Sequence, residues 1–177
     1  MREIEFRGKR TDNGEWVYGS LISKYDADAC IPCTYYIIET TSFSRDVYND
    51  KSLYDVVNYG DYYEVNEDTI CQYTGIKDKN GTKIFEGDIV KILYTDWASK
   101  SDNDTRTLEE YLDSLTKVGI VCWDNLSLCY HLKMKNECFG SIHCGKYGYI
   151  EVIGNICDNS ELLEVCNAIK RLSTANN

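Results

Sequence analysis

Apolar and polar positions alternate at the start of the chain, which predicts a β-hairpin. Charged and apolar residues take turns over residues 3–7, and residues 16–22 form a second strand-like run. An Asp-Asn-Gly sequence at residues 12–14 lies between the two runs and is a strong turn signal, because Asn and Gly tolerate positive backbone dihedrals. We therefore expect an N-terminal hairpin over residues 3–22.

Further strand-like runs, rich in β-branched and aromatic residues, follow along the chain. They cover residues 33–39, 69–73, 87–94, 117–124, 126–134 and 147–156. Apart from the first of these runs, the pattern is weak over residues 23–68, which we expect to form an irregular excursion. A turn signal at residues 124–125 predicts a second hairpin. Residues 86–90 are expected to pair with residues 118–121 at the centre of a small barrel.

Two segments have helical rather than strand-like periodicity. In residues 95–117, Thr107 and Glu110 have the spacing of a capping box, and we expect a helical insertion between two strands. Residues 158–172 predict a C-terminal helix, because acidic residues lie in its first turn and basic residues in its last, which suits the helix dipole. The apolar positions of the insertion are Leu108, Tyr111, Leu112 and Leu115.

Together these elements predict an α+β fold that consists mainly of antiparallel β-sheet. The length of 177 residues fits a single domain over residues 1–177. No apolar run reaches the roughly 18 residues of a transmembrane helix. The N-terminal residues also lack the apolar stretch of a secretory signal, so we expect a cytoplasmic protein.

The charge balance restricts the classes of partner. Lys plus Arg is 19 and Asp plus Glu is 29, which gives a formal net charge of −10 at pH 7. Such a chain does not collect on nucleic acid or anionic membranes by electrostatics alone, so both are unlikely partners. With 15 Tyr and 3 Trp, aromatic rings could stack on single-stranded bases, although they serve equally well as sheet core and surface.

Nine cysteines cannot all pair within one chain, and without a secretory signal we expect reduced thiols that pack as small apolar residues. The pair Cys30 and Cys33 precedes a strand rather than the helix that a redox dithiol requires. A zinc site remains an alternative, but the spacing of its candidate ligands is irregular. These candidates are Cys30, Cys33, Cys129, His131, Cys138, His143 and Cys144.

The two histidines also suggest nucleophilic chemistry with a neighbouring cysteine. That chemistry needs a third group to orient the imidazole, and no such group can be named from the sequence. Serine-hydrolase, zinc-protease and nucleotide-binding motifs are missing from the sequence. We therefore predict that the protein is not an enzyme and has no cofactor.

Residues 70–90, with the sequence Ile-Cys-Gln-Tyr-Thr-Gly-Ile-Lys-Asp-Lys-Asn-Gly-Thr-Lys-Ile-Phe-Glu-Gly-Asp-Ile-Val, resemble the signature of the YopX-like family of phage and prophage proteins. The resemblance extends to residues 1–20 and 151–163. It implies an SH3-like barrel, expression in a bacterial cytoplasm from a phage or prophage, and frequent self-association. It implies no catalytic residues, and it leaves the segments 23–61, 95–116 and 133–145 without explanation.

Most of this signature is interpretable as scaffold, because Gly and Asp are favoured in turns. A binding rim is the alternative, formed by Tyr73, Lys77, Asp78 and Glu86. Trp97 and Tyr111 in the helical insertion are further candidate contacts. The leading hypothesis is a non-enzymatic module that binds a host or phage protein, for example to inhibit a host defence, and that forms homo-oligomers. The alternatives are a binder of a small ligand, a nucleotide or single-stranded nucleic acid, and a zinc-stabilised accessory protein.

Overall fold

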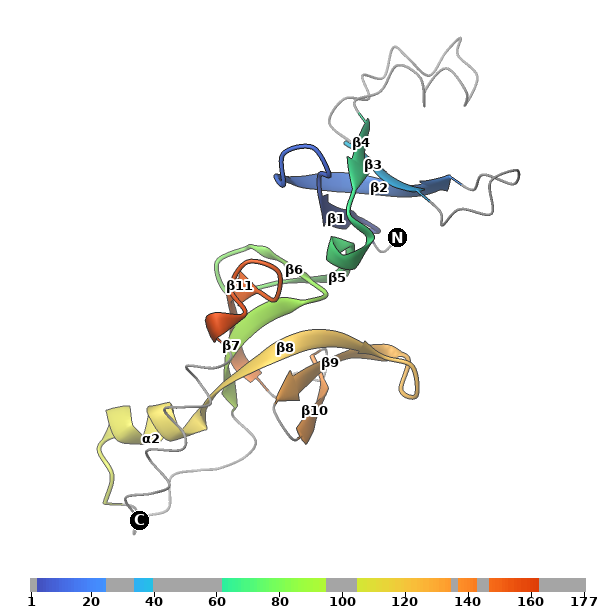
Figure 1. Ribbon diagram of the computed structural model, residues 1–177. Coiled ribbons are helices and arrows are strands. Elements are labelled where there is room, and N and C mark those ends of the chain that lie inside the picture. The colour runs from blue at the N-terminus through green and yellow to red at the C-terminus, as the bar shows by residue number, and fades with distance from the viewer. Residues whose placement is uncertain are drawn as a thin grey trace. The chain divides into compact units, whose positions relative to one another are not determined.

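The computed structural model describes residues 3–24, 34–39, 62–94, 105–134, 137–142 and 147–162 (Figure 1). The chain divides into two compact units, Met1–Tyr73 and Thr74–Asn177. In both, the described residues lie mostly in antiparallel strands, so the predicted predominance of antiparallel sheet is confirmed. Each unit is described by itself below.

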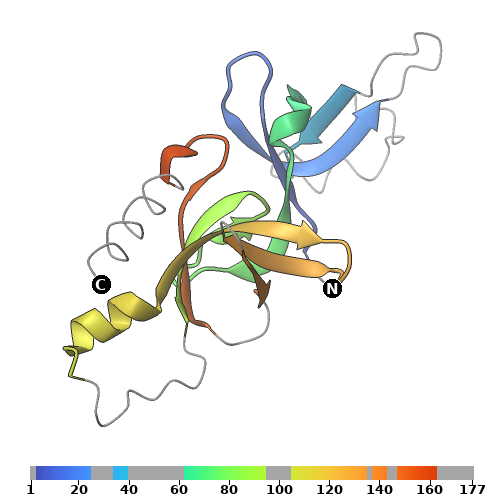
Figure 2. The ribbon, with the colours of Figure 1, turned by 60° about the horizontal axis from the view of Figure 1, so that its bottom comes forward.

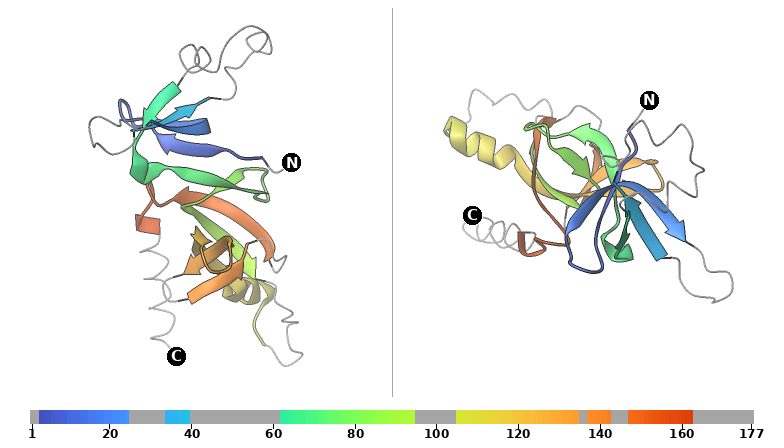
Figure 3. Two further views of the ribbon diagram at one scale, coloured as in Figure 1. Left: turned by 90° about the vertical axis from the view of Figure 1, so that its right-hand side faces the viewer. Right: turned by 90° about the horizontal axis from the view of Figure 1, so that it is seen from above.

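The first unit is a sheet with the strand order β4-β3-β2-β1-β5. Its elements are β1 (Phe6–Lys9), β2 (Trp16–Lys24), β3 (Thr34–Ile38), β4 (Tyr62–Val65), the 3-10 helix η3 (Glu67–Thr69) and the start of β5 (Cys71–Lys77). The predicted N-terminal hairpin is confirmed, with Phe6 opposite Gly19 and Lys9 opposite Trp16 (Figure 3). Its turn places Gly14 at a φ of 74°.

The core of the first unit is small and lies on one face of this sheet. Val17, Ile37 and Val65 are at most 4% exposed and form its centre. Val65 belongs to β4, which pairs with β3 inside the segment that the sequence leaves irregular. The four residues of β4 alternate between exposed and inward positions, and a run this short gives a weak periodic signal.

The second unit contains a five-stranded antiparallel sheet with the order β10-β9-β8-β7-β11. The elements of this unit are the end of β5, β6 (Lys83–Phe85), β7 (Asp88–Tyr94), α2 (Leu108–Leu115), β8 (Thr116–Asp124), β9 (Cys129–Met134), β10 (Glu137–Ser141) and β11 (Tyr147–Asn155). β6 pairs with β5 and lies outside the five-stranded sheet. The predicted pairing at its centre is confirmed, with Ile89 opposite Ile120 and Val90 opposite Gly119. The second predicted hairpin is also confirmed, as β8 and β9.

The predicted small barrel is not closed among the described strands, and its SH3-like character is not confirmed. A barrel requires its first and last strands to pair with each other. Here the sheet is open, with β10 and β11 at its two ends. The pairing of β10 with β9 is already irregular, because the register shifts between Phe139 and Ser141.

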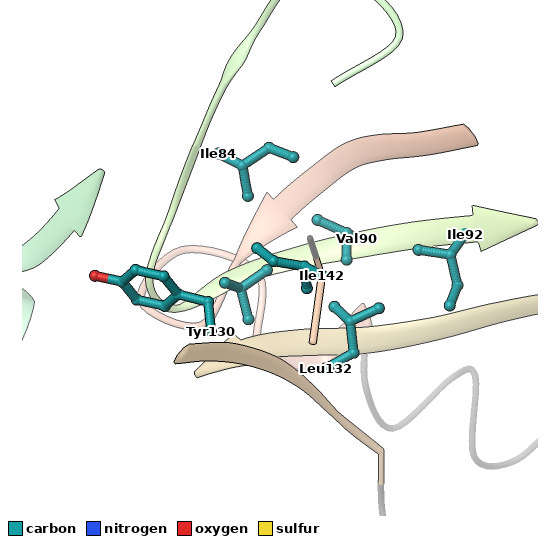
Figure 4. Close-up of a cluster of buried hydrophobic side chains, with 7 residues drawn as sticks. Ile84, Val90, Ile92, Tyr130, Leu132 and Ile142 are labelled. Carbon is teal, nitrogen blue, oxygen red and sulfur yellow. The ribbon is translucent and has the colours of Figure 1, made fainter. Parts of the chain in front are cut away.

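A larger core holds the second unit together (Figure 4). Its side chains come from β6, β7, β8 and β9 and from the residue that follows β10, and none is more than 4% exposed. They are Ile84, Val90, Ile92, Val121, Tyr130, Leu132 and Ile142. Tyr130 extends this core toward the end of the hairpin, because its ring makes an edge-on contact with Trp123 at 5.1 Å between centroids.

The predicted helical insertion is confirmed over α2, and so is its capping box. The backbone N–H of Glu110 donates to Thr107 Oγ1 at 3.2 Å, and the N–H of Thr107 donates back to Glu110 Oε2 at 2.8 Å. The remainder of the insertion, residues 95–104, lies outside the described residues, as do residues 163–172 of the predicted C-terminal helix. Within the described ranges, none of the helices has the length and apolar character needed to cross a bilayer.

Candidate functional site

The β8–β9 hairpin ends in a turn (Figure 2). Residues 123–129 at this end are named here the hairpin tip, and several of their apolar side chains are exposed. Leu126 is 95% exposed, Leu128 is 71% exposed and Trp123 is 39% exposed. Single exposed apolar side chains are ordinary, but three within six residues form a cluster. Among the described residues of the second unit, the hairpin tip therefore carries the two most exposed large apolar side chains, Leu126 and Leu128.

Asp124 fixes the shape of the hairpin tip. Its carboxylate accepts hydrogen bonds from the backbone N–H groups of Leu126 and Ser127, both at 3.2 Å, and from the hydroxyl of Ser127. The N–H of Leu128 donates to the Asp124 carbonyl at 2.9 Å. The hydrogen bond from the Ser127 side chain, followed by that from the Leu126 backbone, lowers the pKa of Asp124. The turn therefore contains an ionised carboxylate at neutral pH.

Leu128 has an unusual backbone conformation for its residue type. Its φ is 53°, in the left-handed region that glycine and asparagine adopt readily and leucine rarely. It is the one residue other than glycine with a positive φ among the described residues. A strained position of this kind is a signal of function when the side chain contributes little to the core.

Four polar side chains converge behind this turn. His131 Nε2 lies 2.8 Å from Ser127 Oγ, 3.1 Å from Cys129 Sγ and 4.0 Å from an Asp124 carboxylate oxygen. Cys129 and His131 are two residues apart on β9, so their side chains lie on the same face of the sheet. No group that orients a histidine beside a cysteine can be named from the sequence, and the structure places Ser127 and Asp124 there.

A sequence signal for this cluster does exist. The i, i+2 spacing of Cys129 and His131 on a predicted strand indicates a shared face. Asp124, three residues before Ser127 at a predicted turn, has the spacing of a side chain that accepts from the turn. The turn that brings Asp124 and Ser127 close to Cys129 and His131 depends on the backbone conformation of Leu128. No residue pattern predicts a leucine with a left-handed backbone.

The structure describes three of the seven zinc ligands predicted from the sequence. Cys129 and His131 lie together, as stated above, and Cys138 lies on β10. The other four candidates, Cys30, Cys33, His143 and Cys144, fall outside the described residues. Among the residues that the structure does describe, no group of three His, Cys, Asp or Glu side chains could hold a metal ion. Zinc binding stays a prediction.

The residues of the predicted binding rim have different environments. Tyr73 is 3% exposed and Asp78 is 8% exposed, whereas Lys77 is exposed. Glu86 is half-buried, and its carboxylate accepts from the backbone N–H of Trp123 at 3.3 Å. Burial makes Tyr73 and Asp78 poor first contacts for a partner, while a binding role for Lys77 and Glu86 stays a prediction.

Of the two candidate contacts in the helical insertion, the structure describes only Tyr111. Tyr111 on α2 is half-buried, and the guanidinium of Arg106 lies over its ring at 5.3 Å from the centroid. Its exposed apolar neighbours on α2 are Leu108 and Leu112. Trp97 lies outside the described residues.

Comparison with protein-family models decides the family. The model described as YopX protein matches residues 5–164. The chain belongs to the YopX family. The resemblance found in residues 70–90 is thereby confirmed. Because the match runs through both compact units, a YopX unit comprises the two of them together.

Among solved structures, the YopX chain is similar to one described as protein EF1440 from Enterococcus faecalis, with 21% sequence identity and a TM-score of 0.45. The alignment covers 92% of this chain and 99% of that one. No curated protein matches the sequence. The chemistry of this YopX chain has therefore to be argued from its own residues.

Proposed function

We propose that this YopX-family chain is a non-enzymatic interaction module, encoded by a phage or prophage, that binds a host or phage protein in the bacterial cytoplasm. The hairpin tip is its contact surface in the second unit. The observation that carries the proposal is Leu128, which is 71% exposed and has a φ of 53°.

Both properties of Leu128 work against the stability of the isolated protein. A left-handed backbone costs a leucine roughly 1–2 kcal/mol, and glycine would remove most of that cost. The exposed side chain gains nothing from burial within its own chain. A leucine side chain that contributes neither to the turn nor to the core suits a surface that becomes buried against a partner.

The partner that fits this surface has an apolar pocket with basic residues around it. Burying a leucine side chain contributes about 1.5–3 kcal/mol, so Leu126 and Leu128 together could anchor a complex. The net charge of −10 favours encounter with a positively charged surface. Nothing in the described residues favours nucleic acid over protein as the partner.

The polar cluster behind the hairpin tip also fits a non-enzymatic role. In a catalytic triad the carboxylate holds the ring nitrogen opposite to the one that meets the nucleophile. Here Asp124, through Ser127, lies at the same nitrogen, Nε2, that faces Cys129. This arrangement fixes the imidazole within the turn and does not reproduce the geometry of a hydrolase.

A capture experiment with paired variants tests the proposal. Tagged wild-type protein, Leu126→Ser, Leu128→Gly and the control Leu108→Ser are used to recover partners from nuclease-treated lysate of a phage-bearing bacterium. Leu108 is a matched control, because it is 68% exposed but lies on α2, at the other end of β8. A protein that is recovered by wild type and control, and whose affinity falls about 10-fold or more in both tip variants, supports the proposal.

Other outcomes of this experiment overturn it. Loss of the partner in Leu108→Ser alone would move the contact surface to α2, as the sequence analysis expected. Recovery of nucleic acid before nuclease treatment, or of zinc by elemental analysis, would favour one of the alternative functions.

The variant Leu128→Gly should also change stability in a direction opposite to its effect on binding. We expect the free energy of unfolding of the second unit to stay constant or to rise by up to about 1 kcal/mol, because relief of the left-handed leucine exceeds the extra chain entropy of glycine. Urea unfolding of the purified variant measures this. A fall of more than about 1 kcal/mol would mean that Leu128 stabilises the fold after all.

A further inference from the structure

We propose that Asn80 is a site of spontaneous covalent modification, at which the asparagine is converted to isoaspartate and the second unit thereby loses stability. The reacting groups are its own side-chain amide, the backbone nitrogen of Gly81 and water. Asn80 and Gly81 lie in the exposed turn between β5 and β6, within residues 70–90, which carry the resemblance to the YopX family. The proposal is independent of the interaction module, because the reaction needs no partner.

The Asn-Gly sequence presents little steric resistance to this reaction. The backbone nitrogen of the residue after the asparagine attacks the side-chain carbonyl carbon, and a side chain on that residue would crowd the attack. Gly81 has no side chain, and an atom at its Cβ position would meet nothing within 4 Å, so the space around it is open. Asn80 and Gly81 are both exposed, which admits water to the reacting atoms.

The reaction balances with water as the only added reagent. The Gly81 nitrogen loses its proton and bonds to Cγ of Asn80, which closes a five-membered imide ring. The bond from Cγ to the amide nitrogen breaks, and this nitrogen takes up a proton and leaves as ammonia. One water then opens the ring at either carbonyl, which gives aspartate or isoaspartate. In isoaspartate the chain runs through Cγ, so the backbone is one carbon longer and the α-carboxylate is free.

A second Asn-Gly pair, Asn13 and Gly14, is also exposed but is held against the reaction. Glu15 fixes both ends of the Asn13 amide, because its N–H donates to Oδ1 and its carboxylate accepts from Nδ2, each at 2.9 Å. These bonds oppose the rotation that brings Cγ to the Gly14 nitrogen. Among the described residues, none forms a hydrogen bond with the Asn80 side chain. Both glycine N–H groups donate to a carbonyl, at 3.1 Å for Gly14 and 3.0 Å for Gly81, so the two pairs differ in the asparagine side chain.

Isoaspartate at position 80 would disrupt the turn, because Asp78 holds the backbone on both sides of the modified residue. One oxygen of Asp78 accepts from the N–H of Asn80 at 2.8 Å and from the N–H of Thr82 at 2.9 Å. An extra backbone carbon between these donors prevents one oxygen from accepting both in the same geometry. The other oxygen accepts from the N–H of Val152 at 3.1 Å, which carries the disturbance to β11. The freed α-carboxylate also adds a negative charge near Asp78.

Ageing of the purified full-length protein tests the reaction rate. The protein is kept at physiological temperature and slightly alkaline pH, and peptide mass spectrometry follows ammonia loss and water uptake at both asparagines. We expect Asn80 to react at least about 5-fold faster than Asn13, because two hydrogen bonds hold the Asn13 amide. In Glu15→Ala, the rate at Asn13 should rise about 3-fold or more, while Asn80 keeps its rate. Equal rates at the two asparagines in the folded wild type would overturn the proposal.

A second measurement separates the extra backbone carbon from the added charge. Ion exchange isolates the modified protein, which carries one more negative charge, and peptide chromatography measures its isoaspartate content. We expect the urea midpoint to fall in proportion to that content, whereas Asn80→Asp, which has the charge without the extra carbon, should stay close to the wild type. Asn80→Gln closes the ring more slowly and should keep its midpoint through the same ageing. An isoaspartate form with the midpoint of Asn80→Asp would overturn the proposal.

Discussion

Replacing Asp78 with alanine should lower the free energy of unfolding of the second unit by about 3 kcal/mol or more. Asp78 is 8% exposed, and its carboxylate accepts three backbone hydrogen bonds. One oxygen accepts from the N–H groups of Asn80 at 2.8 Å and Thr82 at 2.9 Å. The other accepts from the N–H of Val152 at 3.1 Å. Alanine would leave all three donors without this acceptor.

The position of Asp78 explains why the loss should affect the whole unit. The bonds to Asn80 and Thr82 shape the turn between β5 and β6, while the bond to Val152 attaches that turn to β11, 74 residues away in sequence. Lys79 supports the same attachment, because its backbone N–H donates to the Ile150 carbonyl at 2.9 Å. Removing one carboxylate therefore weakens both a local turn and a long-range contact.

The pH dependence of stability gives a second measure of Asp78. Burial raises the pKa of this carboxyl, but the hydrogen bonds from Val152, Thr82 and Asn80 outweigh burial, so that the net effect lowers the pKa. A lowered folded-state pKa contributes stability above the unfolded value of about 3.9. This contribution is lost as pH falls through the folded-state pKa. Stability should thus fall less steeply with acid in Asp78→Ala than in the wild type.

Asp78→Asn is the control that separates shape from charge. The asparagine oxygen can still accept from Asn80 and Thr82, but its amide group would meet the N–H of Val152 donor to donor. We expect an intermediate loss of about 1–2 kcal/mol, measured by urea unfolding at pH 7. If the free energy of unfolding of Asp78→Ala lay within about 0.5 kcal/mol of the wild-type value, the three hydrogen bonds would make no net contribution to stability.

The sequence predicted best where a few neighbouring residues determine the structure. The Asp-Asn-Gly turn of the first hairpin and the Thr107–Glu110 capping box are local signals, and both are present. The β4 strand was missed because its four residues acquire their place only by pairing with β3. A small barrel was expected where the described strands form an open sheet, because the pairing of edge strands such as β10 depends on contacts that no local pattern specifies.

The candidate site was predictable in part for the same reason. Asp78 was recognised as a residue of interest, but its bond to Val152 depends on the tertiary fold, so its structural contribution could not be inferred from the turn sequence. Cys129 and His131 were named as zinc candidates, whereas their closeness to Ser127 results from the backbone of Leu128. Residue types indicated chemistry, and the turn geometry determined which chemistry is available.

Gly19→Ala should be the most damaging single substitution in the first unit. A Cβ atom at Gly19 would lie 1.9 Å from the Ile38 carbonyl oxygen, 2.7 Å from the carbon of that carbonyl and 3.1 Å from the Cα of Glu39. All three are backbone atoms at the end of β3, and they cannot move away without breaking the pairing of β2 with β3, in which Ser20 lies opposite Ile38. We expect the free energy of unfolding of the first unit to fall by about 3 kcal/mol or more.

Gly14→Ala provides the matched control, because it separates steric collision from backbone preference. Gly14 has a φ of 74°, but a Cβ there would meet nothing within 4 Å. Gly14→Ala should lower the free energy of unfolding by only about 1 kcal/mol, because only the left-handed backbone disfavours alanine there. Hydrogen exchange of the β1–β3 amides, with urea unfolding, measures both variants. Equal losses in the two would contradict the collision and would mean that β3 can shift, with Val17 and Ile37 repacking at little cost.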